Sequence, residues 1–144
     1  MFVSEPGYSG NIDTIVGFDD KLKILGIVIL HQTETPGLGT RCLEVADDTT
    51  IIDVIIGRDK KSKTPLKPWF QEQFVGLSMN EPVNIEFKGD WTPKIRDELL
   101  QRNSITSISG ATITSRAVLR GIESQALWLK QLLAENEKND EENE

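Results

Sequence analysis

The strongest strand signal in the chain reads Lys23-Ile24-Leu25-Gly26-Ile27-Val28-Ile29-Leu30. Such a concentration of branched apolar residues is typical of a buried central strand. The preceding run Asn11-Ile12-Asp13-Thr14-Ile15-Val16 alternates roughly between polar and apolar residues, and Asp19-Asp20-Lys21 has the composition of a turn. Residues 10–18 and 22–30 therefore predict a β-hairpin.

The clearest helix pattern lies near the end of the chain. Ser115 precedes it and is predicted to be its N-cap. After Ala134 the chain is rich in Glu and Asn and has no apolar residue, so residues 135–144 are expected to be a disordered acidic tail. The apolar residues that recur every three or four positions are Val118, Ile122, Ala126, Leu129 and Leu133.

Shorter elements are expected between the hairpin and this helix. Residues 51–56 predict a strand or a helical turn, and residues 57–67 a basic surface loop. Residues 69–74 predict a short helix with inward aromatics, residues 82–87 a strand, and residues 92–102 a helix. Because strands and helices do not alternate regularly, we expect one α+β domain with a largely antiparallel twisted sheet and flanking helices.

Composition narrows the class of protein. The chain has 144 residues and a net charge of −7, which disfavours nucleic acid as a partner. Residues 135–144 hold six acids and one lysine, so the expected domain, residues 1–134, is close to neutral. Cys42 and His31 are the single residues of their types, so neither a disulfide nor a metal site is expected.

No apolar run is long enough to cross a bilayer, and the first residues do not read as a signal peptide. We therefore expect a soluble protein, or a soluble part from which an upstream membrane anchor has been removed.

A hydroxyl-rich segment precedes the last helix and reads Ser109-Gly110-Ala111-Thr112-Ile113-Thr114-Ser115. Small residues allow a ligand to approach the backbone closely. A helix start presents unpaired N–H groups and the positive end of the helix dipole, which together favour an anion such as a phosphate. From the residues alone, a phosphate site and a simple turn with an N-cap both stay open.

A proline loop follows the second strand of the hairpin and reads Glu34-Thr35-Pro36-Gly37-Leu38-Gly39. Pro36 fixes one φ angle and Gly37 and Gly39 reduce crowding, so this backbone could pack flat against a planar ligand. Glu34 would accept hydrogen bonds from ring N–H groups or cap the loop. The alternative is a tight connection after a buried strand.

Together, the two motifs resemble the FMN-binding domain family, found in the G subunit of Rnf electron-transport complexes and the C subunit of the sodium-translocating NADH:quinone reductase. The resemblance begins at a tyrosine loop, Gly7-Tyr8-Ser9-Gly10, and covers about residues 7–130. It implies FMN as the cofactor, with its phosphate bound to Thr112. The other residues that it implies at the flavin are Ser109, Gly110, Ala111, Thr114, Ser115, Glu34, Thr35, Pro36, Gly37, Leu38 and Gly39.

The resemblance implies an electron carrier without a catalytic site of its own, in an ion-translocating membrane complex. Its partners would be the other subunits, on the extracytoplasmic face, and a flavin transferase that uses FAD to attach the phosphate to Thr112. The family usually has Asp where this chain has Thr106, so covalent and non-covalent FMN both stay open. The alternatives are an assembly module without flavin and a soluble reductase with its own substrate.

Overall fold

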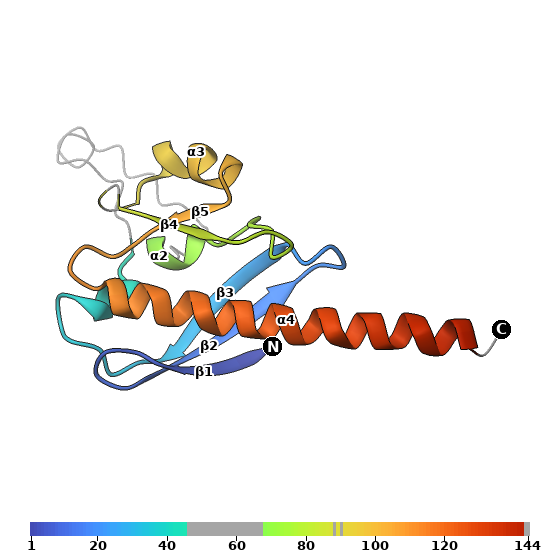
Figure 1. Ribbon diagram of the computed structural model, residues 1–144. Coiled ribbons are helices and arrows are strands. Elements are labelled where there is room, and N and C mark those ends of the chain that lie inside the picture. Colours follow the sequence, from blue (N-terminus) through green and yellow to red (C-terminus); the bar gives the residue numbers. More distant parts are fainter. Residues whose placement is uncertain (46–67, 88, 90, 143–144) are drawn as a thin grey trace, which may run out of the picture.

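The computed structural model describes residues 1–45, 68–87, 89 and 91–142. The expected strand or helical turn at residues 51–56 and the expected basic loop at residues 57–67 lie outside the described residues. The described residues form an α+β fold, as predicted from the sequence. It has a three-stranded antiparallel sheet, a smaller two-stranded sheet and flanking helices (Figure 1).

The main sheet confirms the predicted hairpin. It contains β1 (Phe2–Pro6), β2 (Asn11–Phe18) and β3 (Ile24–His31) in that order, with both pairs antiparallel. Side chains alternate between the two faces of a strand, so one face of the sheet faces the core. The inward residues of β2 and β3 are Ile12, Thr14, Val16, Ile24, Ile27 and Ile29.

The short aromatic helix is also confirmed. In α2 (Trp69–Glu72) and the turn after it, Trp69, Phe70 and Phe74 are buried and pack edge to face. The 3-10 helix η1 (Gly39–Leu43) packs against α2, which also contacts β3. These aromatics fill the space next to the sheet because their large apolar surface is favourable to bury.

The second sheet pairs β4 (Asn84–Glu86) with β5 (Ser104–Thr106), and the two strands are parallel. A parallel pair needs a crossover connection, and η2 (Pro93–Ile95) with α3 (Arg96–Gln101) supplies it. The predicted strand at residues 82–87 and the predicted helix at residues 92–102 are both present. The regular strand and helix are shorter than those predicted. Figure 1 shows α3 on the outer side of this strand pair.

The last helix begins four residues earlier than the predicted N-cap implies, at Thr112, so Ser115 is not its N-cap. In the structure, α4 is Thr112–Glu142, and Gly110 makes the preceding turn with φ +77. The Ser115 hydroxyl donates instead to the Ala111 carbonyl at 3.2 Å, inside the first turn. A serine hydroxyl can also bond back to the carbonyl four residues earlier inside a helix, so the residue type alone did not locate the helix start.

The two halves of α4 have different surroundings. Its first half crosses the main sheet and contacts β1 and β2, whereas its far end extends beyond the rest of the fold (Figure 1). Ile122 and Ala126, in the first half, are buried, whereas Leu132 and Leu133, in the far half, are exposed. The helix continues to Glu142 rather than ending at Ala134, because a helix that is already nucleated extends easily through Glu and Lys. The division of the chain at residue 134 stays a prediction.

Candidate functional site

A cavity of about 330 Å³ lies where three segments distant in the sequence meet. Tyr8 comes from the tyrosine loop, four residues come from the proline loop, and five come from the turn and first residues of α4. The structure therefore brings both sequence motifs to one cavity. The lining residues are Tyr8, Glu34, Thr35, Leu38, Gly39, Gly110, Ala111, Thr112, Ile113 and Thr114.

Most of the predicted site residues line this cavity. The exceptions are Ser109, Ser115, Pro36 and Gly37, which belong to the same motifs but are not part of its wall. That the lining residues contact FMN stays a prediction. Tyr8 and Ile113 line the wall as well, although no chemical pattern in the sequence marked them as ligand residues. The available signal was their position, Tyr8 in the tyrosine loop and Ile113 in the hydroxyl-rich segment.

Thr112 is the first residue of α4 and is half-buried in the cavity wall. The N–H groups of the first helical turn have no partner within the helix, and the helix dipole gives this end a partial positive charge. Thr112 therefore combines a hydroxyl with an environment that favours an anion. Leu38 and Ile113 are exposed beside it and give the cavity an apolar rim.

The next two hydroxyls are used inside the protein. Thr114 and Ser115 are both buried. The Thr114 hydroxyl donates to Oε2 of Glu34, while Ser115 Oγ accepts the N–H of Ile108 at 3.0 Å. Both hydroxyls therefore fix the start of α4 against neighbouring segments, and Thr112 differs from them in lining the cavity while only half-buried.

Glu34 is the most enclosed carboxylate among the described residues at this cavity, with 4% of its surface exposed. Its Oε1 accepts the N–H of Tyr8 at 2.9 Å and the N–H of Ser9 at 3.0 Å. Its Oε2 accepts the hydroxyl of Thr114. Glu34 thus caps a loop, which is the tyrosine loop, and the hydrogen bonds from ring N–H groups to Glu34 stay a prediction.

Residues 7–126 match the family described as the FMN-binding domain. This match covers most of the chain and includes all three segments of the cavity wall. The chain belongs to the FMN-binding domain family. Its cofactor is therefore FMN.

Similar proteins support this membership. The G subunit of the ion-translocating oxidoreductase complex of Aliivibrio fischeri is 31% identical over 126 residues, which are 88% of this chain and 45% of that protein. The G subunit of the same complex in Vibrio parahaemolyticus is 28% identical, covering 90% of this chain and 47% of its own length. This FMN-binding domain thus spans about half the length of the curated relatives that it matches.

A solved structure shares the fold. The crystal structure of the C subunit of Na(+)-translocating NADH-quinone reductase from Parabacteroides distasonis aligns with a TM-score of 0.52 and 25% sequence identity. The alignment covers 86% of this chain and 50% of that one. Among the described helices of this FMN-binding domain, none is long and apolar enough to cross a membrane.

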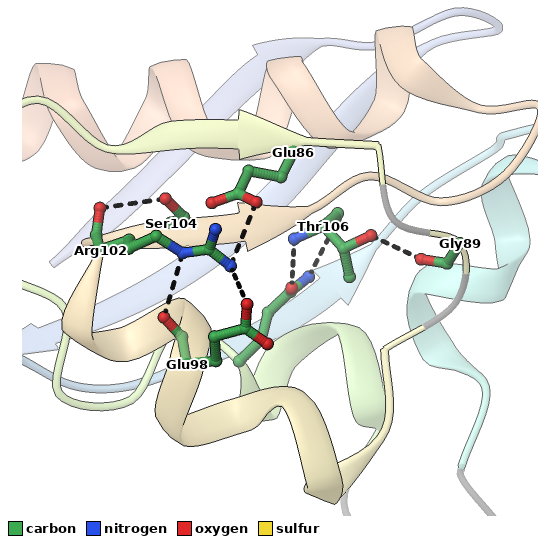
Figure 2. Close-up of polar contacts among 7 residues, drawn as sticks. Glu86, Gly89, Glu98, Arg102, Ser104 and Thr106 are labelled. Carbon is green, nitrogen blue, oxygen red and sulfur yellow. Dashed lines mark hydrogen bonds and ion pairs between the residues drawn. The ribbon is translucent and has the colours of Figure 1, made fainter.

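Thr106 occupies the position where the family resemblance implies an aspartate. It is fully buried, and its hydroxyl donates to the Gly89 carbonyl at 2.6 Å (Figure 2). The Gln73 amide also bonds both the N–H and the carbonyl of Thr106. An ionised carboxylate has no proton to donate, so aspartate could not replace this bond to Gly89. Position 106 therefore has a structural role in this FMN-binding domain.

A surface ion-pair group lies beside Thr106. Arg102 pairs with Glu98 at 2.9 Å and with Glu86 at 3.4 Å (Figure 2). These pairs connect α3 to β4. Arg102 is substantially exposed, so the pairs contribute little to stability. These residues lie outside the wall of the cavity at the start of α4.

Cys42 lies in η1 and is completely buried. Burial raises the pKa of the Cys42 thiol to about 12, and the nearby negative charge of Glu34 contributes to this rise. A thiol that stays protonated is a poor nucleophile and a poor metal ligand. In the part of the chain that the structure describes, His, Cys, Asp and Glu form no group of three that could hold a metal ion.

A second cavity, of about 440 Å³, lies between β3 and α2. Its wall is mainly apolar and includes Val28, Ile29, Leu43 and Val75. Among the described residues of this wall, none belongs to the proline loop or to the hydroxyl-rich segment before α4. The smaller cavity is lined by residues of both motifs and by the first turn of α4, whose N–H groups favour an anion, so it suits FMN better than the larger cavity.

Proposed function

We propose that this FMN-binding domain carries electrons within an ion-translocating membrane electron-transport complex, with the phosphate of FMN held at Thr112. The observation that supports this proposal most strongly is the shared cavity of the proline loop and the start of α4. FMN supplies the redox chemistry when bound, while the protein positions it and controls its exposure. No acid–base pair or nucleophile of the protein is needed for such a role.

The residues of the cavity fit FMN. Its volume falls within the range of about 300–1,000 Å³ that is typical of small-molecule sites. Gly39, Gly110 and Ala111 lack long side chains, so the backbone can approach a planar ring. The first turn of α4 offers N–H groups to the phosphate, and Thr112 adds a hydroxyl.

The finer proposal is a covalent bond at Thr112. A flavin transferase would join the Thr112 oxygen to the FMN phosphorus of FAD while the bond from that phosphorus to AMP breaks, so that AMP leaves. A threonine hydroxyl is a weak nucleophile and needs such an activating enzyme. The half-buried position of Thr112 in the cavity wall supports its choice over the buried Thr114 and Ser115.

The test is intact mass together with the visible spectrum, after expression with and without a flavin transferase. With the transferase we expect a mass increase of FMN less water, which Thr112→Val abolishes and Thr112→Ser retains because serine keeps the hydroxyl. Yellow protein without a mass increase would favour non-covalent FMN. Colourless protein in both cases, with no FMN uptake on titration, would overturn the flavin proposal.

The partners in this proposal are the other subunits of the complex, at the extracytoplasmic face of the membrane. Relatives named as subunits of ion-translocating complexes support it. The exposed side chains of Tyr8, Leu38 and Ile113 give the cavity an apolar rim on which a partner could dock transiently. Crosslinking from Ile113→Cys to a co-purified subunit tests this contact, and crosslinking only from a position remote from the cavity would contradict it.

A further inference from the structure

The Glu34 carboxylate joins three segments that are far apart in the chain. Tyr8 and Ser9 lie 26 and 25 residues before it, and Thr114 lies 80 residues after it. All three bonds meet at one buried side chain. Charged groups make stronger hydrogen bonds than neutral ones, and a buried carboxylate is stable only when such donors satisfy it.

Two glycines leave the space that this carboxylate occupies. A Cβ atom at Gly7 would lie 2.5 Å from Glu34 Oε1. A Cβ atom at Gly39 would lie 2.6 Å from Glu34 Cβ and 2.7 Å from Thr114 Oγ1. Real Cβ atoms do not approach neighbours this closely, so either substitution would displace the Glu34 side chain. The glycines of two separate loops are therefore fitted to the Glu34 side chain.

We infer that Glu34 is a positioning residue, which holds the tyrosine loop and the first turn of α4 in the arrangement that binds FMN. This inference rests on the proposed FMN site. Glu34 acts through Tyr8, Ser9 and Thr114 rather than on the reacting atoms of the flavin. Without its carboxylate, the tyrosine loop loses its acceptor and the cavity loses its shape, while the sheet and the aromatic core stay folded.

The test compares FMN titrations of the apoprotein with hydrogen exchange of the Tyr8 and Ser9 amides. We expect Glu34→Ala to weaken FMN binding by about tenfold or more and to speed exchange of both amides, with the circular dichroism spectrum unchanged. Glu34→Gln keeps one carbonyl acceptor and the side-chain length, so it should restore slow exchange and most of the affinity. A purely electrostatic role would leave Glu34→Gln as weak as Glu34→Ala.

Asp19 provides a matched control. Its carboxylate also accepts two backbone N–H groups, from Lys21 at 2.9 Å and Lys23 at 2.8 Å, but in a turn that does not line the cavity. Asp19→Ala should leave FMN affinity unchanged. Thr114→Val should weaken binding, and adding it to Glu34→Ala should cost less than the sum of the two single effects, because both changes break the same bond.

The outcomes separate this inference from the proposed function. Absence of FMN binding by the wild-type protein would contradict the proposed function, whereas the amide exchange would still test Glu34. Unchanged exchange at Tyr8 and Ser9 in Glu34→Ala would overturn the positioning role. Wild-type FMN affinity of that variant, or full additivity with Thr114→Val, would overturn it too. If Glu34→Ala does not fold, FMN titrations of the other two variants test the inference, because Thr114→Val should weaken binding and Glu34→Gln should keep most of the affinity.

Discussion

The two ends of α4 differ in almost every respect. At the first turn, Thr114 and Ser115 are buried and hydrogen-bonded to other segments. In the far half, Leu132 and Leu133 are exposed, and the helix extends beyond the rest of the fold (Figure 1). One helix thus contains both a firmly held end and an end that depends on helix propensity. The candidate binding site is at the end that other segments hold in place.

The largest effect on stability is expected in the buried half of α4. Ile122 is completely buried, so Ile122→Ala should lower the free energy of unfolding by about 2–5 kcal/mol, because it leaves a cavity. Leu133→Ala, in the exposed far half of α4, should change it by about 0.5 kcal/mol or less. Denaturant unfolding measures both values. Equal losses would mean that the far half of α4 is packed as tightly as the near half.

The next effect concerns the fit around Glu34. Gly39→Ala should weaken FMN binding by about tenfold or more, because its methyl group would displace Glu34 and Thr114. At Gly26 in β3, a Cβ atom would have no neighbour within 4 Å, so Gly26→Ala is the control and should bind FMN normally. Isothermal titration with FMN measures both. Normal FMN binding by Gly39→Ala would show that the space around Glu34 and Thr114 can accommodate a methyl group.

A smaller effect is expected from pH. The Cys42 thiol has a pKa of about 12 in the folded protein and an ordinary value of 9.0. Between these values the unfolded chain loses a proton that the folded protein keeps, so the stabilising contribution present below pH 9 declines as pH rises, by about 1 kcal/mol at pH 10. Chemical unfolding at pH 8 and pH 10 should show this decline, and Cys42→Ala should reduce it. An equal decline in both proteins would refute the assignment to Cys42.

The smallest effect is expected from the acidic tail. Removing residues 135–144 should change the free energy of unfolding by less than about 0.5 kcal/mol and leave FMN affinity unchanged, because residues 135–142 lie beyond the buried half of α4. Thermal unfolding of the shortened chain tests the predicted division at residue 134. A loss of several degrees in the unfolding temperature would place the tail within the folded domain.

Local pattern predicted much of the fold. The hairpin of β2 and β3 and the aromatic helix α2 follow from periodicity and composition, which act over a few neighbouring residues. The parallel pairing of β4 with β5 depends on the crossover through α3, and no local signal specifies it. The start of α4 was misplaced because Ser115 bonds within the first turn rather than capping it.

The candidate site was predictable to a similar degree. Both motifs indicated a ligand, and the structure brings them to one cavity. The sequence could not reveal that Glu34 and Thr114, which are 80 residues apart, bond to each other. Each residue lies in a motif that indicates a ligand, so each was predicted to contact the flavin. Nor could it reveal that Thr106 is buried and bonded to Gly89. Such tertiary partners are visible only after the chain has folded.

The most direct test of the central claim is hydrogen exchange of the apoprotein with and without FMN. If FMN binds where the proline loop meets the start of α4, amides of residues 35–39 and 110–114 should gain protection. Amides around the second cavity, at residues 26–29 and 71–75, should then stay unchanged. Protection confined to the β3–α2 cavity would contradict the account.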